Sequence, residues 1–278
     1  MGRYPDAMPK SALARRIGLK AFSRLNPGDI HITHHWTGDR LRLHSFRHKG
    51  YWYHGFRRER ATMLSLVRLL GRGDVVVEAG GHIGYLTLHC ARLVGEGGAV
   101  HVFEPGPNNL PYLHTNVGSI RNVVVVEEAV GSVAGVAELF VEDLTGQNNT
   151  MLADAREYHR TSQSAGVNAH THVVSVPVTT MDHYCAENGI APDLTKIDVE
   201  SFELEVLEGS KKTLERDRPI VLVEIGRRED DVLSLMTSWG YALFSDDLRR
   251  LRSARPGANY VFLHEGTHEA LIDRYVSV

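Results

Sequence analysis

The segment "GDVVVEAGGHIGYLTLHCARLVG", residues 73–95, constrains the fold of this chain more than any other. An apolar run is followed by Glu78, then by a glycine-rich turn, and then by apolar residues at helical spacing. The pattern predicts a strand over 75–79, a tight turn and a helix over 84–94. Such a turn lets the backbone approach a ligand closely and points helix amides at it.

Strands alternate with helices on both sides of this segment. The sequence predicts a helix ending at Gly71, a strand over 99–104, a helix over 107–117 and a strand over 123–126. After an antiparallel excursion in "VGSVAGVAELFVED", the parallel pattern resumes with "VVSVPV", "TTMDHYCAENG", "DLTKIDVE", "SFELEVLEGSKKTL", "PIVLVEI" and "DDVLSLMTSWG". We therefore expect an α/β fold with a mostly parallel sheet covered on both faces, ending in the strand pair "YALFSDD" and "NYVFL".

Two regions depart from this pattern. Residues 1–60 predict a small N-terminal cap, with short alternating segments "RLRLHSF" and "GYWYHGF", ahead of a main domain over 61–278. The polar stretch 144–172 is too long for an ordinary connection and predicts a mobile or functional loop. Residues 1–60 hold 13 Lys and Arg against 4 Asp and Glu, a net charge of +9, so the remaining residues carry −12.

The composition indicates a soluble, cytoplasmic chain. No apolar run is long enough for a membrane span, and the first residues lack the apolar core of a signal peptide. The two cysteines, Cys90 and Cys185, predict packed thiols rather than a disulfide framework.

The spacing of the glycine turn selects among nucleotide ligands. A dinucleotide fingerprint is G-x-G-x-x-G, whereas this turn reads E-x-G-x-x-x-G, from Glu78 through Gly80 to Gly84. An acid at that position repels a pyrophosphate and attracts a cation. S-adenosylmethionine carries an ammonium and a sulfonium, and its carboxylate can use the helix amides, so charge favours this ligand.

The next two strands supply further candidate contacts. Glu104, followed by Pro105, ends a strand 24 residues beyond Gly80, where a carboxylate can accept both ribose hydroxyls. An NAD enzyme would have the same acid, so Glu104 alone does not discriminate. Glu128 is a candidate adenine contact at the end of the third strand, with a solvated acid pair as the alternative.

The ordered set of motifs resembles the FkbM family of S-adenosylmethionine-dependent methyltransferases. The resemblance covers about residues 60–264 and rests on the glycine turn, "VFEP", "VTTMDHY", "PIVLVEI" and above all "LTKIDVESFELEVLEGS". Ser201 stands where the family usually has glycine, and Glu78 with Gly81 and His82 replaces the commoner Asp and Ala-Asn. The family implies a Rossmann-like class I methyltransferase fold with seven strands, the last antiparallel, and O-methylation of a sugar or polyketide-type natural product.

Activation of an alcohol needs a base or a metal, because a neutral hydroxyl is a poor nucleophile. Asp198, Glu200 and Glu224 lie at or just beyond the ends of two central strands, where this fold gathers catalytic groups. We expect Asp198 to contact the donor or the acceptor hydroxyl, and Glu200 and Glu224 to be candidates for the base. If Mg²⁺ is used, Asp198, Glu200 and Glu224 are its candidate ligands. Glu203 is instead expected to cap the following helix, and Lys196 to be a buried partner of these acids.

Histidines give a mixed signal. His82 lies within the glycine turn and is a candidate base or donor contact. The cap holds His31, His34, His35, His44 and His48, yet their spacings match no standard zinc site.

Three rival functions remain open from the sequence. An NAD-dependent oxidoreductase could use the same sheet, a nucleic-acid methyltransferase could use the basic cap, and a binding protein could retain an inactive fold. The sequence favours a small-molecule acceptor, predicts no membrane partner and gives no RNA-binding module. The oligomeric state stays open, with a homodimer as one option.

Overall fold

The computed structural model describes residues 28–142, 145–152 and 171–276 of the 278-residue chain. Residues 1–27 of the expected cap lie outside the described residues. So do residue 144 and residues 153–170 of the expected mobile loop.

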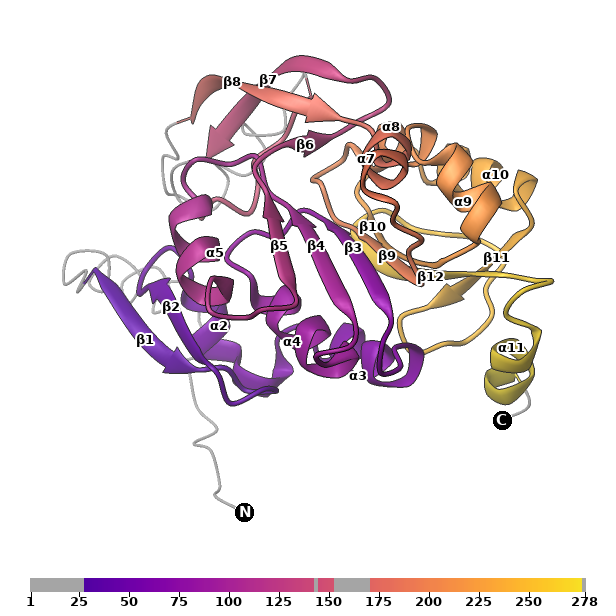
Figure 1. Cartoon of the computed structure of the whole chain (residues 1–278), viewed down its shortest axis with the longest axis horizontal. Coiled ribbons are helices and arrows are strands. Elements are labelled where there is room, and N and C mark those ends of the chain that lie inside the picture. Colours follow the sequence, from indigo (N-terminus) through magenta and orange to yellow (C-terminus); the bar gives the residue numbers. More distant parts are fainter. Residues whose placement is uncertain (1–27, 143–144, 153–170, 277–278) are drawn as a thin grey trace, which may run out of the picture.

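A seven-stranded sheet forms the centre of the molecule (Figure 1). Its strands, in chain order, are β3 (Val75–Ala79), β4 (Ala99–Phe103), β5 (Val123–Val126), β9 (Leu194–Ile197), β10 (Ile220–Ile225), β11 (Tyr241–Ser245) and β12 (Ala258–His264). In space they run β11-β12-β10-β9-β3-β4-β5, and only β12 is antiparallel to its neighbours. This confirms the predicted seven-stranded sheet with a reversed last strand.

Helices cover both faces of this sheet (Figure 1). They are α3 (Arg60–Leu69), α4 (Tyr85–Val94), α5 (Leu110–Val117), α7 (Met181–Asn188), α8 (Glu203–Glu208), α9 (Lys211–Asp217), α10 (Glu229–Ser238) and α11 (Glu269–Val276). Alternate residues of β3 serve the two faces: Val77 packs in the cluster with α7 to α10, and Val76 in the cluster with α3 and α4. Glu78 shares the face of Val76 and therefore points toward α4.

One predicted helix is two helices in the structure. The segment 201–214 bends at Gly209 and Ser210, between α8 and α9. A side chain at Gly209 would place its Cβ 2.0 Å from the carbonyl oxygen of Gly131, so this close backbone approach requires glycine.

A second, three-stranded sheet lies beside the central one (Figure 1). It consists of β6 (Ala129–Val130), β7 (Gly135–Glu142) and β8 (Thr171–Thr179), in the order β6-β8-β7. The prediction that "VVSVPV" rejoins the parallel sheet is therefore wrong, because β8 pairs antiparallel with β7. Its alternating exposed and buried residues suit a half-exposed sheet rather than a buried parallel strand.

The described part of the cap is a hairpin followed by a short helix. Its elements are β1 (Asp29–Thr33), β2 (Arg40–His44), α2 (Lys49–His54) and the 3₁₀ helix η1 (Gly55–Arg57). The alternation in "RLRLH" forms a strand as expected, with Leu41 and Leu43 fully buried. "GYWYHGF" is helical instead: Tyr51 is buried whereas Tyr53 is 46% exposed, so these two residues do not share one face of a strand.

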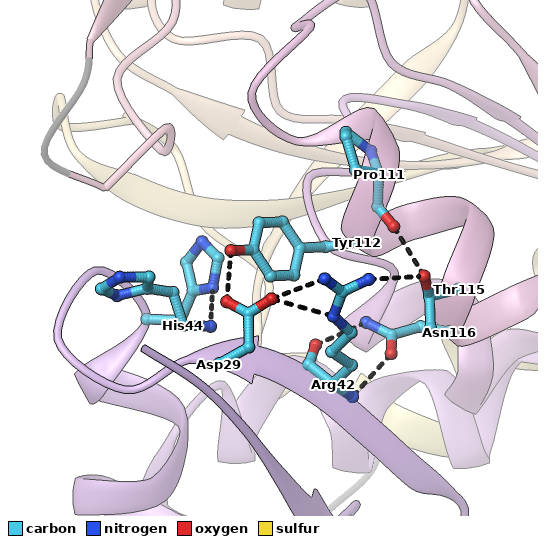
Figure 2. A network of polar contacts seen from close by, with 8 residues as sticks. Asp29, Arg42, His44, Pro111, Tyr112, Thr115 and Asn116 are labelled. Carbon is cyan, nitrogen blue, oxygen red and sulfur yellow. Dashed lines mark hydrogen bonds and ion pairs between the residues drawn. The ribbon is translucent and has the colours of Figure 1, made fainter. Parts of the chain in front are cut away.

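Polar contacts attach the hairpin to α5 (Figure 2). The Arg42 guanidinium pairs with Asp29 at 2.6 Å, and the Tyr112 hydroxyl donates to the other oxygen of Asp29 at 2.7 Å. The Asn116 amide on α5 bonds both backbone polar groups of Arg42, accepting at 2.7 Å and donating at 3.0 Å. These contacts hold the cap next to the end of the sheet where β4 meets α5.

Within the described part of the chain, no helix has the length and apolar character needed to cross a bilayer. Cys90 and Cys185 are both buried and unpaired.

Candidate active site

A cavity of about 270 Å³ lies beyond the carboxyl ends of β3, β4, β9 and β10. In an open parallel sheet this is where the strand order reverses and ligands bind. Of the predicted site residues, ten line it: Glu78, Gly80, Gly81, His82, Glu104, Pro105, Glu128, Asp198, Glu200 and Glu224. Gly84 does not. It precedes α4 and packs against Leu113 and Val117, where a Cβ would lie 3.0 Å from each.

The glycine turn is as tight as the sequence pattern requires. The amides of Gly80 and Gly81 both donate to the carbonyl of Phe103, which joins the turn to the end of β4. Gly80 has φ +90°, and a Cβ there would lie 1.9 Å from the backbone oxygen of Asp198. Any side chain at Gly80 would push β3 and β9 apart at the point where the cavity opens.

Glu78 and Lys196 form a buried pair under this turn. They are opposite each other in the register of β3 and β9, and their charged atoms are 3.6 Å apart. Lys196 also lies 3.1 Å from Asp198 and donates to the carbonyl of Gly80 at 3.0 Å. Burial alone would lower the pKa of Lys196, but the carboxylates of Asp198 and Glu78 outweigh it and raise that pKa. The predicted role of Lys196 as a buried partner is confirmed.

The Glu78 carboxyl has a second partner, the Thr87 hydroxyl on α4, which donates to it at 2.7 Å. Burial raises the pKa of Glu78, and Lys196 opposes that rise. Glu78 is therefore held behind the turn by Lys196 and Thr87.

Glu104 is 4% exposed and accepts hydrogen bonds from three N–H groups. Oε2 accepts from the backbone amide of His82 at 2.7 Å. Oε1 accepts from the amide of Gly106 at 2.8 Å and from Nδ2 of Asn109 at 3.2 Å. Burial raises the pKa of Glu104 to about 7, although these donors favour the ionised form.

His82 is held at both ring nitrogens. The Thr145 carbonyl can only accept, so Nε2 donates to it at 3.2 Å, which leaves Nδ1 to accept from the Tyr51 hydroxyl at 2.9 Å. Burial lowers the pKa of His82 to about 4. In this arrangement the ring is neutral and its basic nitrogen is occupied, which suits positioning better than proton abstraction. Its φ of +50° also explains the family's asparagine here, since Asn and His both tolerate that conformation.

Asp198 and Glu224 face the same cavity in different electrostatic settings. Asp198 is paired with Lys196, as described. No hydrogen bond or ion pair among the described residues ends on the Glu224 carboxylate. Burial, together with the nearby charge of Asp198, raises the pKa of Glu224 to about 7. Glu224 is therefore the carboxyl in this cavity best suited to take up a proton near neutral pH.

The loop after β9 is held in an unusual conformation. Glu200 and Ser201 have φ of +52° and +73°, and the Glu200 carbonyl accepts from the Thr150 hydroxyl at 2.8 Å. Glu203 accepts from the amide of Ser201 at 2.7 Å and from that of Gly226 at 3.1 Å. Glu203 is the first residue of α8, but it makes no cap hydrogen bond to the helix, so the predicted capping role is wrong. Its carboxylate instead holds the loop before α8 and ties it to the end of β10. The φ of Ser201 accounts for the glycine that the family usually has there.

Glu127 and Glu128 have different surroundings. Glu127 is exposed and pairs with His114 at 2.8 Å, whereas Glu128 lines the cavity. The acid pair is thus divided, with only Glu128 placed to meet a ligand.

Sequence reasoning did not identify which residues of the cap reach the cavity. Tyr51, Arg58 and Glu59 line the cavity, and the Arg58 guanidinium lies 4.2 Å from the centre of the Tyr51 ring. Arg58 also approaches Glu59 to 3.5 Å. The aromatic and basic content of the cap was visible in the sequence, but no local pattern showed which of its residues would reach the cavity.

The segment 145–152 belongs to the polar stretch 144–172, which the sequence predicts to be a mobile or functional loop. Residues Gly146 to Met151 line the cavity. The segment is attached to His82 through Thr145, to Asn109 through the Gly146 carbonyl at 3.0 Å, and to Tyr51 through Gln147 at 3.5 Å. It connects the glycine turn with the cap.

A metal has no ready ligand set here. Among the described residues, no group of three or more His, Cys, Asp or Glu side chains is arranged to hold an ion. Asp198, Glu200 and Glu224 share the cavity without forming such a group, so we assign no step to Mg²⁺. In the cap, His34 bonds the carbonyl of Tyr85 at 3.0 Å and His48 is bonded by the amide of His44 at 3.0 Å.

The strand order, the reversed strand and the cavity at the switch point define a class I methyltransferase fold. A sequence model of the methyltransferase FkbM domain matches residues 78–243, more than half of the chain. The chain belongs to the FkbM methyltransferase family. Comparison with curated proteins gave no match.

Solved structures resemble the chain only distantly. A methyltransferase FkbM from Methylobacillus flagellatus is 13% identical, with a TM-score of 0.44 over 76% of this chain. The match spans 60% of that protein's length. Aeropyrum pernix fibrillarin with bound S-adenosyl-L-methionine is 14% identical, with a TM-score of 0.42 over 74% of this chain and 73% of that one. A SAM-dependent O-methyltransferase from Thermotoga maritima is 12% identical, with a TM-score of 0.40 over 73% and 63%. Similarities this distant do not transfer a ligand or a substrate.

Proposed function

We propose that the protein transfers a methyl group from S-adenosylmethionine to a hydroxyl of a sugar or a polyketide-type natural product. One observation carries the proposal: a single cavity joins the Gly80 turn and the Glu104 carboxyl to the Glu224 carboxyl. The first two suit the donor, and the third suits removal of a hydroxyl proton. When bound, the donor supplies an electrophilic methyl group on a sulfonium.

The residues around the glycine turn fit that donor chemically. Gly80 and Gly81 leave room for close approach, and Glu78 places a carboxylate behind them that favours a cation over a pyrophosphate. Glu104 and Pro105 lie where the fold places a ribose, and Glu128 is available to the adenine edge. We call residues 78–82 with Glu104, Pro105 and Asn109 the donor wall.

The opposite side of the cavity is proposed to hold the acceptor. It is formed by Tyr51, Arg58 and Glu59, by residues 147–151, and by Asp198, Glu200 and Glu224; we call this the acceptor wall. Its polar groups suit an acceptor rich in hydroxyls. Arg58 and the amides of segment 147–151 can donate hydrogen bonds, and the acids can accept them.

Glu224 is the proposed base. Asp198 already has a partner, because Lys196 lies 3.1 Å from its carboxylate, whereas the Glu224 carboxylate has no ion pair with a described residue. We assign Asp198 and Lys196 to positioning the reacting groups, and Glu224 to taking the proton from the acceptor hydroxyl. Placement of the acceptor against the donor supplies much of the remaining acceleration.

Labelled methyl transfer tests the proposal. The wild-type protein is incubated with labelled S-adenosylmethionine and a panel of glycosides and macrolide-type alcohols, with matched amines and an RNA pool as further acceptors. We expect label on an alcohol, and unchanged turnover in EDTA. Transfer only to amines or RNA would contradict the proposed acceptor, and loss of turnover in EDTA with recovery in Mg²⁺ would contradict direct base catalysis.

An NAD-dependent oxidoreductase would need a glycine turn that binds a pyrophosphate. Glu78, buried behind Gly80, disfavours the pyrophosphate of NAD, and the chain lacks G-x-G-x-x-G at this turn. Nucleic-acid methylation has only the charge of the cap in its favour. A steep salt dependence of RNA binding would support that alternative.

A further inference from the structure

The backbone amides of the glycine turn are already bonded inside the protein. Four of them donate to protein oxygens: those of Gly80, Gly81, His82 and Gly84. Ile83, Tyr85 and Thr87, which complete the turn and begin α4, are at most 1% exposed. Leu86 is the one residue of 80–87 left to offer an amide, and a single N–H leaves most acceptor positions of a carboxylate unmet. The carboxylate of the proposed donor therefore needs a partner other than the helix amides expected from the sequence.

Two residues with a permanent positive charge line the cavity among the described residues, Arg58 and Lys196. The three N–H donors of Lys196 have three partners: Glu78 at 3.6 Å, Asp198 at 3.1 Å and the Gly80 carbonyl at 3.0 Å. Lys196 is therefore fully engaged under the turn. Arg58 is the cation that remains for a ligand.

The Arg58 guanidinium has N–H groups without partners. Four of its N–H donors lie on the two terminal nitrogens. Glu59, 3.5 Å away, and the Tyr51 hydroxyl engage at most two of these four, so at least two are left among the described residues. The Arg58 side chain is 19% exposed, and both of these neighbours line the cavity with it, so a ligand in the cavity can reach the guanidinium.

Arg58 also lies next to the donor wall. Its guanidinium is 4.2 Å from the centre of the Tyr51 ring, and the Tyr51 hydroxyl donates to His82 in the glycine turn at 2.9 Å. Burial lowers the pKa of His82, and the nearby charge of Arg58 lowers it further. The cap thus brings a cation to the edge of the glycine turn.

A guanidinium presents its N–H groups as a planar fork that matches both oxygens of a carboxylate. We infer that Arg58 is a further donor-binding residue, whose terminal N–H groups hold the carboxylate at the amino-acid end of S-adenosylmethionine. This inference rests on the proposed function, because it assumes that donor in the cavity. It moves Arg58 from the acceptor to the donor and makes the cap part of the donor site. An acceptor with a carboxylate would offer the same chemistry, so the test is done without any acceptor.

The test is a set of calorimetric titrations with S-adenosylhomocysteine and its decarboxylated analogue, which has a hydrogen in place of the carboxylate. The wild-type protein, Arg58→Gln and Arg58→Lys are each titrated with both ligands. Arg57→Gln is the matched control, because it removes the same charge one residue away, and Arg57 is exposed and does not line the cavity. Thermal unfolding of each variant establishes that it is folded.

We expect the wild-type protein to bind the decarboxylated analogue about 10- to 100-fold more weakly than S-adenosylhomocysteine, the range for hydrogen bonds to a charged group. Arg58→Gln should lose about the same factor for S-adenosylhomocysteine and bind the analogue no more weakly than wild type does. Arg58→Lys keeps the charge without the fork, so it should lose less. Arg57→Gln should match the wild type with both ligands.

Three outcomes would overturn the inference. Wild-type affinity of Arg58→Gln for S-adenosylhomocysteine would leave Arg58 to the acceptor, with the proposed function unaffected. Equal weakening of both ligands would mean that Arg58 only supports Tyr51 and His82, and Arg58→Lys gives the same comparison if Arg58→Gln does not fold. If the wild-type protein binds neither ligand, the proposed function fails and the inference fails with it.

Discussion

The donor wall and the acceptor wall differ in how far the protein satisfies its own polar groups. In the donor wall, Glu78 has Thr87 and Lys196 as partners, and Glu104 has three N–H donors. In the acceptor wall, the Glu224 carboxylate has no hydrogen bond or ion pair with any described residue. A wall whose groups are already fixed suits one invariant ligand. A wall with an unpaired polar group suits a ligand that supplies the missing hydrogen bond.

The two walls also differ in how their residues are distributed along the chain. The donor-wall residues, 78–82 with Glu104, Pro105 and Asn109, follow two adjacent strands, and their geometry follows from the β3–β4 pairing. The acceptor wall instead combines the cap, segment 147–151 and the ends of β9 and β10. Two of its residues, Glu59 and Glu200, have φ near +50°, a conformation that costs energy in non-glycine residues.

The largest expected effect is the loss of turnover when Glu224 or Asp198 is replaced by its amide. Glu224→Gln keeps the shape of the side chain but removes the base, so turnover should fall by about 10²- to 10⁴-fold with little change in donor affinity. Asp198→Asn should lower turnover and also weaken donor binding, since Asp198 pairs with Lys196 under the turn. Steady-state kinetics and calorimetry measure the two quantities. Wild-type turnover in both variants would exclude these acids and leave His82 as the next candidate.

The second prediction tests the rigidity of the donor wall. Gly80→Ala forces a Cβ to within 1.9 Å of the Asp198 carbonyl oxygen, at a φ of +90°. We expect the free energy of unfolding to fall by at least about 2 kcal/mol, because backbone on both sides must shift.

Gly97→Ala is the control, because a Cβ at Gly97 would have no heavy atom within 4 Å. Its stability should change by less than about 0.5 kcal/mol. Equal stabilities of the two variants in urea denaturation would contradict the tight turn.

The third prediction concerns pH and the acceptor wall. Burial raises the pKa of Glu224 from 4.5 to about 7, so between these pH values the unfolded chain releases a proton that the folded chain keeps. This contribution to stability is present below pH 4.5 and is lost as pH rises through about 7. Buried histidines, such as His82 with a pKa of about 4, act in the opposite direction, so the prediction is for a difference between variants.

As the pH is raised from 5 to 8, the stability of Glu224→Gln relative to wild type should increase by about 1 kcal/mol, after allowance for partial solvent screening. Urea denaturation of both proteins across this range measures the difference. If Glu224→Gln instead loses stability relative to wild type as the pH rises, Glu224 is stabilised as a carboxylate and is no longer a candidate for the base.

The smallest expected effect concerns the loop between the walls. Ser201 has a φ of +73°, and Ser201→Gly should stabilise the protein by up to about 1 kcal/mol by relieving that conformation. Ser201→Ala keeps the conformational cost and serves as the control. A glycine variant less stable than the alanine variant would show that the serine side chain itself stabilises the loop.

The difference between the walls also explains how much the sequence could predict. The strand–turn–helix pattern at residues 73–95 and the acid two residues before Gly80 are local features, so the sheet and the donor wall could be anticipated. The opposite position of Glu78 and Lys196 follows from strand register and was anticipated as a buried pairing.

What could not be predicted depends on contacts between distant parts of the chain. Tyr51 reaches His82 only because α2 packs against the end of the sheet, and the helix itself was concealed by an alternating pattern of aromatic residues. The strand 171–179 belongs to the second sheet because it pairs with β7, which lies far earlier in the chain. The three N–H donors to Glu104 come from residues 82, 106 and 109, and no sequence pattern shows that they converge on it.

Donor binding tests the central claim most directly. Isothermal titration of the wild-type protein with S-adenosylhomocysteine, and separately with NAD⁺, reports whether the donor wall selects a cationic nucleoside or a pyrophosphate. We predict one binding site per chain for S-adenosylhomocysteine, weakened in Glu104→Ala by about 1.5 to 3 kcal/mol, and no heat with NAD⁺. Saturable NAD⁺ binding, or S-adenosylhomocysteine affinity unchanged in Glu104→Ala, would contradict the assignment of this wall.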